Sequence, residues 1–216
     1  MSATLHYIHD PLCGWCYGAQ PLVSAAMEAL GGRLQLQLHG GGLFGEPRTL
    51  DPSLAEHILH ADERIAQMSG QVFGKSYREG LLAEQGTVLY SLPPIAAVLA
   101  AESLDPASAY PMLVAIQNAH YQRGLRVVEP SVLGELAEEI GLDGAKFALS
   151  FASSNGTPLY DHLQTSRRLL EEVGGQGFPT LVLEQHGQQQ VLSHHTYYGQ
   201  PGAFVKMLAS ALPTLH

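Results

Sequence analysis

The sequence predicts a mixed α/β fold built from a βαβ unit and a ββα unit, with a large all-helical insertion between them. Segments with strand character lie near the two ends of the 216-residue chain, and helical periodicity dominates the middle. A third observation bears on function. Both cysteines lie within four residues of each other, where the first predicted strand gives way to the first predicted helix.

The first unit begins with a short strand at residues 5–8, which an Asp-Pro pair ends. A helix follows, because apolar residues recur at helical spacing until a pair of glycines stops the pattern; they are Cys16, Ala19, Val23, Ala26, Met27 and Leu30. Leucine then alternates with polar residues over residues 34–38, a period typical of a strand with one buried face. Two parallel strands joined by a helix form a right-handed βαβ unit.

Only helices are predicted from about Asp51 to Val173. Two Asp-Pro pairs, at residues 51–52 and 105–106, each place a capping aspartate before a proline at the first helical position. Apolar side chains form helical stripes, of which the first comprises Leu54, Ile58, Ala61, Ile65, Met68 and Val72. We interpret these stripes as core positions and not as contacts to a cofactor.

The mixed pattern resumes near the C-terminus. Residues 180–183 and 190–192 are predicted strands joined through a glycine, and a closing helix is indicated by the spacing of Phe204, Met207, Leu208 and Ala211. The predicted organisation is an N-terminal part of the α/β fold at residues 1–48, a helical insertion domain at 49–174, and a C-terminal part of the α/β fold at 175–216.

The cysteine pair predicts a reversible disulfide. Cys13 and Cys16 are separated by Gly14 and Trp15 at the expected start of the first helix. Unpaired N–H groups and the helix dipole stabilise an anion there, so a thiol in this position is acidified into a nucleophilic thiolate. Helical residues three apart have Cβ atoms roughly 5 to 6 Å from each other, so one thiol can attack a substrate and the other can resolve the product.

Three structural alternatives explain the pair less well. A packing accident would not usually place both cysteines together at a strand–helix junction. A static disulfide closing so short a loop removes little entropy from the unfolded chain. A zinc ion normally takes four ligands, and the chain has no second cysteine pair and no histidine pair at finger spacing. A mixed cysteine–histidine site is the remaining metal alternative, and we expect redox chemistry and no metal ahead of it.

Composition excludes several other classes of function. Only 14% of the residues are charged and the formal net charge is -9, so we expect neither nucleic acid nor an anionic membrane as a partner. The first strand begins too early for a signal peptide, and no stretch is long and apolar enough to span a bilayer. We expect a soluble cytoplasmic protein, and in a reducing compartment a cysteine pair is more often catalytic or redox-sensing than structural.

Two segments carry a family resemblance. Residues 10–18, which include the Cys-Gly-Trp-Cys motif, resemble the active-site segment of DsbA-like proteins, notably the FrnE-like branch. Residues 177–180, Gly-Phe-Pro-Thr, resemble the cis-proline loop before the third strand of a thioredoxin fold. The order of elements fits that fold, and the helical insertion resembles that of the DsbA family. The chain is thus similar to a cytoplasmic member of this family in the thioredoxin superfamily.

The resemblance implies roles for individual residues. Cys13 would be the exposed attacking thiolate and Cys16 the more buried resolving thiol. Pro179 would be cis and face the cysteines, and Phe178 and Thr180 would bind an extended substrate segment in strand fashion. Gly14, Trp15 and Asp10 would support the pair.

Departures from better-known members suggest a milder couple. Trp15 stands where periplasmic oxidants carry a histidine, and tryptophan cannot donate a charged hydrogen bond to the thiolate, so a mildly reducing or isomerase-like enzyme is expected. Tyr7 replaces the buried acidic residue found six positions before the first cysteine in many thioredoxin folds. Asp10 either relays protons to Cys16 or is a turn residue at the strand end.

Two functions remain open at this stage, and a non-catalytic copper or zinc carrier is a third possibility. One is a thiol-disulfide oxidoreductase acting on protein or low-molecular-weight thiols. The other is a glutathione-dependent transferase or isomerase of the kappa and hydroxychromene carboxylate isomerase type, although that class usually carries serine at the position of the attacking cysteine. No tightly bound cofactor is expected, and glutathione is a possible co-substrate. The oligomeric state is left open.

Several other polar residues are weaker candidates. His194 and His195 follow the last predicted strand and are either part of a ligand-contacting loop or partly solvated loop residues. His9 and His39 end predicted strands, where histidines either approach an active site or have a structural role. The three glycines at residues 40–42 do not precede a convincing helix, so they do not predict a phosphate loop.

Overall fold

The computed structural model describes residues 3–212 and contains a four-stranded mixed sheet. The strand order is β2-β1-β5-β6. β1 pairs with β2 in parallel and with β5 antiparallel, and β5 pairs antiparallel with β6. The strands are β1 (Ala3–His9), β2 (Leu34–Gly40), β5 (Thr180–Gln185) and β6 (Gln188–Val191). Both predicted pairs of strands are therefore present and belong to one sheet.

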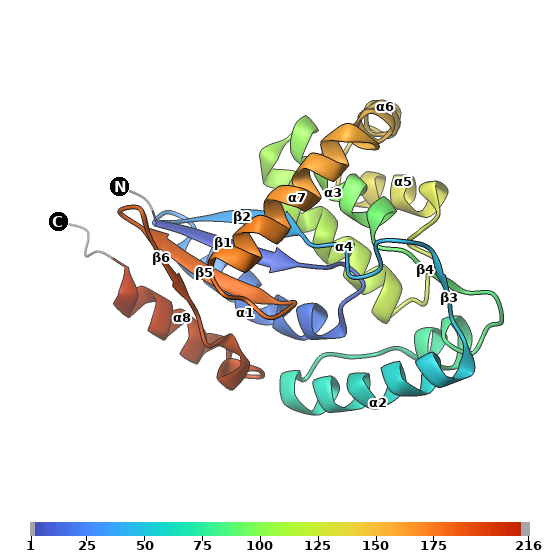
Figure 1. The fold of residues 1–216 in the computed structure, drawn as a ribbon, viewed down its shortest axis with the longest axis horizontal. Coiled ribbons are helices and arrows are strands. Elements are labelled where there is room, and N and C mark those ends of the chain that lie inside the picture. Colours follow the sequence, from blue (N-terminus) through green and yellow to red (C-terminus); the bar gives the residue numbers. More distant parts are fainter. Residues whose placement is uncertain (1–2, 213–216) are drawn as a thin grey trace.

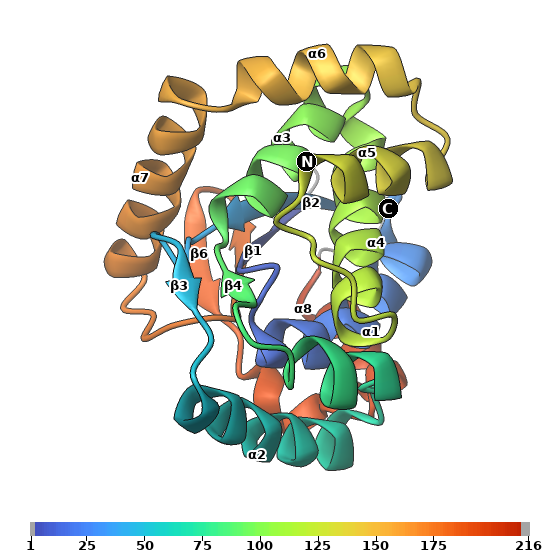
Figure 2. The same ribbon diagram turned by 90° about the vertical axis from the view of Figure 1, so that its right-hand side faces the viewer.

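Helices cover both faces of this sheet. Helices α1 (Gly14–Leu30) and α8 (Pro201–Ala211) lie together on one face, and α7 (Thr157–Glu172) crosses the other (Figures 1 and 2). The core between the layers includes Leu5 and Tyr7 of β1, which are almost fully buried. The alternation in β2 has the predicted effect, because Gln35 and Gln37 are exposed while Leu34 is buried.

The other helices of the insertion lie around the sheet and extend to both ends of the molecule (Figure 2). Helix α2 lies along one end of the molecule, and α6 lies at the opposite end (Figure 2). The helical elements of the insertion and the turn before α8 are α2 (Pro52–Ser69), the π-helical η1 (Ser76–Leu81), α3 (Leu92–Leu104), η2 (Pro106–Ser108), α4 (Ala109–Tyr121), α5 (Pro130–Glu139), α6 (Gly144–Ser154) and η3 (His194–Tyr197). The predicted cap at Asp51 forms, with its carboxylate accepting a hydrogen bond from the Leu54 N–H at 2.9 Å.

The expectation of helices alone between Asp51 and Val173 was wrong at one point. Strand β4 (Val88–Leu89) pairs antiparallel with β3 (Arg48–Thr49). This ladder has two residues on each strand, too few to show a period in the sequence. It joins the insertion to the segment that leaves the sheet.

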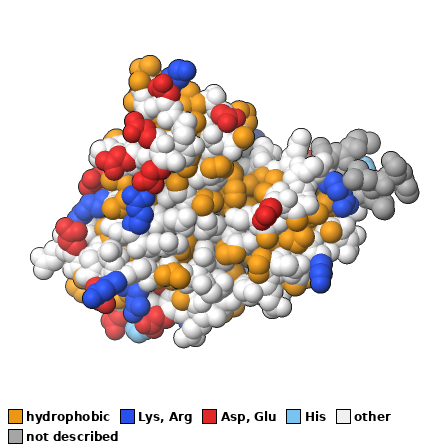
Figure 3. Space-filling model, turned by 180° about the vertical axis from the view of Figure 1, so that it is seen from behind, with side chains coloured by type: hydrophobic (Ala, Val, Ile, Leu, Met, Phe, Trp, Pro, Cys, Tyr) orange, Lys and Arg blue, Asp and Glu red, His pale blue; other side chains and the backbone are white. Residues whose placement is uncertain are grey.

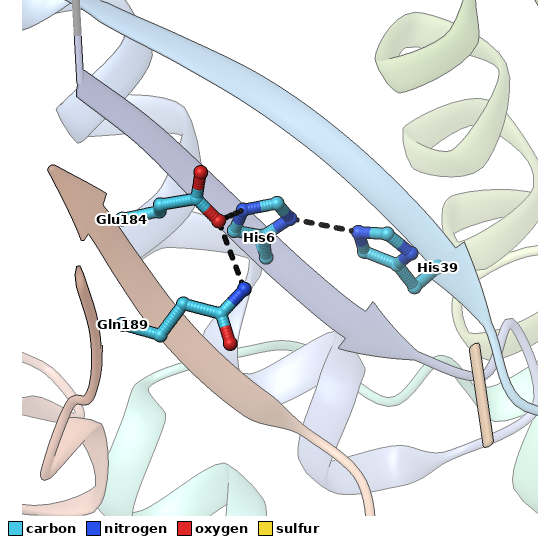
Figure 4. Close-up of polar contacts among 4 residues, drawn as sticks. All are labelled: His6, His39, Glu184 and Gln189. Carbon is cyan, nitrogen blue, oxygen red and sulfur yellow. Dashed lines mark hydrogen bonds and ion pairs between the residues drawn. The ribbon is translucent and has the colours of Figure 1, made fainter. Parts of the chain in front are cut away.

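A chain of polar contacts crosses the sheet (Figure 4). His39 Nε2 on β2 lies 3.0 Å from His6 Nδ1 on β1, and His6 Nε2 lies 3.2 Å from Glu184 Oε2 on β5. Gln189 on β6 donates to the same carboxylate oxygen at 2.8 Å. Burial, followed by the charge of His6, lowers the pKa of His39 to about 4. His39 is therefore a structural link between strands.

The outer surface carries charges of both signs. On the face turned away from the viewer in Figure 1, charged side chains gather toward the end formed by the helical insertion, and hydrophobic side chains are denser near the middle (Figure 3). Among residues 3–212, no helix combines the length and apolar character needed to cross a membrane.

Candidate active site

The two cysteines lie at the start of α1, as the sequence predicts. Cys13 is the residue before the first helical turn, and Cys16 lies within that turn. Both thiols are free. Cys13 is 7% exposed and Cys16 is fully buried. The predicted order of accessibility holds, but Cys13 is less exposed than expected because it lies inside a pocket.

Each sulfur contacts a backbone group. The Cys13 thiol donates to the carbonyl oxygen of Phe178 at 3.4 Å, and the N–H of Asp10 donates to Cys16 Sγ at 3.4 Å. Burial, followed by the hydrogen bond and charge of Cys13, raises the pKa of the Cys16 thiol well above its usual value. The buried sulfur is therefore held protonated while the pocket-facing sulfur contacts the loop opposite.

That loop is the predicted proline segment. The Phe178–Pro179 peptide bond is cis, and the Thr180 hydroxyl donates to the Gly177 carbonyl at 2.8 Å. The Phe178 ring packs on Gly41, where an added Cβ would lie 2.0 Å from two ring carbons. The glycine run at the end of β2 thus allows the Phe178 ring to lie close to the backbone at Gly41.

Asp10 is buried and fully hydrogen-bonded. One carboxylate oxygen accepts from the Leu12 N–H and the Ser91 hydroxyl, both at 2.9 Å, and the other accepts from the Leu43 N–H at 2.7 Å. Burial raises the pKa of Asp10 to about 6 although these hydrogen bonds oppose the shift. Of the two readings of Asp10, these contacts favour a residue that fixes the loop before α1 to the insertion.

Two tyrosines bind carbonyl groups in the first turn of α1. The Tyr7 hydroxyl donates to the Cys16 carbonyl at 3.0 Å, and the Tyr198 hydroxyl donates to the Trp15 carbonyl at 2.9 Å. The Trp15 ring lies 5.6 Å from the Tyr198 ring and 5.9 Å from the Arg64 guanidinium on α2. Trp15 is thus partly buried between the C-terminal segment and the insertion.

A pocket of about 350 Å³ opens beside Cys13. Its walls come from α1, α2, η1, α4 and the proline loop, and its lining is mostly apolar; Leu54, Ile58, Ala61 and Ile65 supply the α2 wall. We predicted this stripe as core, and that interpretation was wrong in part. Only Ile65 of the stripe is buried, while Met68 and Val72 are exposed. A periodic pattern cannot distinguish a core face from a pocket face.

Comparison with known proteins identifies the family. No protein-family model matches the chain, and no curated protein matches it. Among solved structures, the cytosolic disulfide reductase DsbM from Pseudomonas aeruginosa is 48% identical, with a TM-score of 0.90, over 96% of this chain and 98% of that chain. The chain belongs to the DsbA family. A structure of the same Pseudomonas aeruginosa protein with GSH gives a TM-score of 0.88 over the same shares of both chains.

More distant structures show the fold of this DsbA-family protein. A candidate protein disulfide isomerase from Nitrosomonas europaea is 24% identical, with a TM-score of 0.82 over 98% of this chain and 97% of that chain. The oxidoreductase DsbA from Xylella fastidiosa is 17% identical, with a TM-score of 0.52 over 97% of this chain and 87% of that chain. The predicted thioredoxin fold with a helical insertion is confirmed, and the DsbA-family protein is a thiol-disulfide oxidoreductase.

The weaker histidine candidates lie outside the pocket of the DsbA-family protein. His9 is buried, with its ring 5.0 Å from that of Tyr7, and burial lowers its pKa to about 3. His194 and His195 form a short turn before α8, and the His194 ring packs edge-on against Tyr198 at 5.9 Å. His194 therefore contacts Tyr198, whose hydroxyl group is bonded to the Trp15 carbonyl.

Sequence reasoning missed a polar group at the inner wall of the pocket. Asp62, Tyr77 and His120 come from α2, η1 and α4 and line it together with Tyr121. The Tyr77 hydroxyl donates to Asp62 Oδ2 at 2.8 Å. These residues lie far apart in the sequence and match no motif, so no sequence signal joined them. Within residues 3–212, no group of three or more histidine, cysteine, aspartate or glutamate side chains is arranged to hold a metal ion.

Proposed function

We propose that this DsbA-family protein reduces disulfides through Cys13 and Cys16. The thiolate of Cys13 attacks one sulfur of a substrate disulfide, and the other sulfur leaves with the electron pair of the broken bond. Cys16 then attacks the mixed disulfide, which releases the second substrate thiol and leaves a Cys13–Cys16 disulfide. The observation that carries this assignment is the accessibility of the sulfurs, since only Cys13 of the two lines the pocket.

We assign the remaining predicted site residues to supporting roles. Phe178 lines the pocket and presents its carbonyl to Cys13, which suits backbone pairing with an extended substrate beside Pro179. Thr180 contributes by holding that loop, because its hydroxyl is bonded to the loop itself. Gly14 and Trp15 line the pocket wall beside the thiol, and Asp10 fixes the preceding loop.

Glutathione is the proposed electron donor. The supporting observations are the DsbM structure with GSH at 48% identity and a pocket next to Cys13 that is large enough for a small thiol. Two molecules of glutathione would reduce the Cys13–Cys16 disulfide and become one molecule of oxidised glutathione. The transferase alternative is not favoured, because the similar structures are disulfide enzymes and both cysteines are present.

The cellular setting and domain division are also proposals. We propose a cytosolic location, as in the DsbM protein, where glutathione keeps thiols reduced. We propose that residues 1–48 and 175–216 form the catalytic fold and that residues 49–174 form the insertion domain. The β3–β4 ladder across this boundary and the α2 wall of the pocket support an insertion that contributes to substrate binding.

Trapping of substrate tests the assignment. In the Cys16→Ser protein, Cys13 attacks but nothing resolves the product, so mixed disulfides with substrate proteins and with glutathione should accumulate. They should be visible by non-reducing electrophoresis and intact mass. The matched Cys13→Ser protein should trap nothing. Trapping by Cys13→Ser alone would reverse the roles of the two cysteines. Equal trapping by both variants would contradict the assignment of Cys13 as the attacking residue.

A second experiment addresses the direction of electron flow. The Cys13/Cys16 reduction potential is measured by equilibration with glutathione buffers, where a change of about 30 mV shifts a two-electron equilibrium tenfold. A reductase should have a potential close to that of cytosolic glutathione. A value as oxidising as that of the periplasmic oxidants would exclude the proposed direction.

A further inference from the structure

Asp62 is a buried carboxyl group in the pocket that the attacking thiol lines. It lies on α2 and is 4% exposed, and it lines the same pocket as Cys13. Its Oδ1 atom is so close to the first residue of α1 that a Cβ added at Gly14 would lie 2.6 Å from it. The carboxyl group therefore faces the end of the helix at which Cys13 lies, and Gly14 allows this approach.

Within the described part of the chain, the surroundings of Asp62 give it one hydrogen-bond donor and no partner of opposite charge. Tyr77 of η1 donates to Oδ2 at 2.8 Å, and no ion pair involves Asp62 among residues 3–212. The other titratable groups that line the same pocket are His120 and Tyr121 of α4, Cys13 beside α1, and the exposed His57 of α2. Burial lowers the pKa of His120 to about 4, so this histidine is neutral near pH 7 and supplies no compensating charge.

Burial raises the pKa of Asp62 to about 7, although the Tyr77 hydrogen bond opposes the shift. A group that titrates near neutral pH is suited to both donating and accepting a proton. A proton donor can speed thiol-disulfide exchange when the leaving thiol has a high pKa, because a more basic thiolate leaves more slowly. Asp10 is less suited to this role, since its carboxylate oxygens are occupied by hydrogen bonds from Leu12, Leu43 and Ser91.

We propose that Asp62 is the proton donor to the thiol that leaves when Cys13 attacks a disulfide, and that Tyr77 positions its carboxyl group. This inference rests on the proposed function of Cys13. The proton that Cys13 loses on ionising is held by Asp62 and passes to the first leaving sulfur, which leaves Asp62 as a carboxylate. The proton of Cys16 becomes available to the second leaving sulfur, and Asp62 is protonated again when the disulfide is reduced.

Leaving-group dependence tests this role. Reduced wild-type and Asp62→Asn proteins are mixed with 5,5′-dithiobis(2-nitrobenzoic acid), whose aromatic thiol leaves without a proton, and with 2-hydroxyethyl disulfide, whose alkyl thiol is basic. The Asp62→Asn change should slow the alkyl reaction by about tenfold or more at about pH 6 and change the aromatic reaction by less than about twofold. The control is Glu63→Gln, an exposed carboxyl on the same helix, which should change neither rate.

Tyr77→Phe gives a readout that a structural role would not move. It keeps the ring and removes the hydrogen bond that lowers the pKa of Asp62. The inflection near pH 7 in the wild-type rate with the alkyl disulfide should therefore move to higher pH in Tyr77→Phe and be absent from Asp62→Asn.

The outcomes separate this inference from the proposed function. Equal slowing of both disulfides by Asp62→Asn, or an unchanged alkyl rate, would overturn the role of Asp62 while leaving Cys13 as the nucleophile. If wild-type Cys13 reacts with neither disulfide, the proposed function fails and the role of Asp62 fails with it.

Discussion

Replacing Asp62 with asparagine should change how the stability of the protein depends on pH. Burial raises the pKa of Asp62 from 3.8 to about 7, so the folded protein holds a proton that the unfolded chain releases at lower pH. Such a group stabilises the folded state fully below the unfolded pKa, and this contribution is lost as pH rises through the folded pKa. Asparagine has no proton to lose, so the variant should lack this component.

The size of the effect follows from the two pKa values. Relative to Asp62→Asn, the unfolding free energy of the wild-type protein should fall by about 2 to 3 kcal/mol between about pH 5 and about pH 8. Titration of the other buried groups, including Asp10 and His9, is common to both proteins and cancels in the difference.

Urea denaturation followed by far-ultraviolet circular dichroism measures this difference. Both proteins are unfolded at about pH 5 and about pH 8, and the wild-type minus variant free energy is compared. Glu63→Gln, which removes an exposed carboxyl from the same helix, should give the same difference at both pH values. If the wild-type and Asp62→Asn curves run parallel with pH, the carboxyl group is not held protonated by its burial, and the reasoning fails.

Three further substitutions probe the packing around the site. Gly41→Ala should destabilise the protein by about 1 to 3 kcal/mol and slow disulfide reduction, because the added methyl group displaces the Phe178 ring. Asp10→Ala should lower the unfolding free energy by about 3 kcal/mol or more in thermal unfolding, because three donors lose their acceptor. His9→Phe should stabilise the protein more at about pH 5 than at about pH 8, because burial lowers the histidine pKa to about 3 and stability is lost as pH falls below the unfolded value.

Controls and opposite outcomes are available for each. Gly134→Ala, in the middle of α5 with no atom within 4 Å of the added Cβ, should stabilise by up to about 1 kcal/mol; a similar gain at Gly41 would refute the close approach. An Asp10→Ala protein as stable as wild type would mean that water replaces the carboxylate. A His9→Phe effect of the same size at both pH values would show that the histidine is not held neutral.

Local sequence signals predicted the catalytic fold well. The strand at β1, the helix that begins after Cys13 and the proline loop before β5 each depend on residues close together in the sequence. Capping at Asp51 is equally local. The β3–β4 ladder was missed because two residues on each strand carry no period.

The pocket could not be predicted in the same way. The apolar stripe on α2 has the spacing of a core face, and which of its residues are buried depends on where α2 lies relative to α1. The hydrogen bond from Tyr77 to Asp62 joins two elements of the insertion, η1 and α2. The position of the Asp62 carboxyl group beside Gly14 depends on contact between the insertion and the catalytic fold.

The sequence by itself determined the reactive pair, since the helix start and the three-residue spacing of Cys13 and Cys16 are properties of a short segment. Only the tertiary structure decided which residues form the pocket beside Cys13, which carboxyl group is fully hydrogen-bonded and which one lines the pocket. The physical reason is that burial and long-range contacts set accessibility and pKa, and these depend on how distant segments pack.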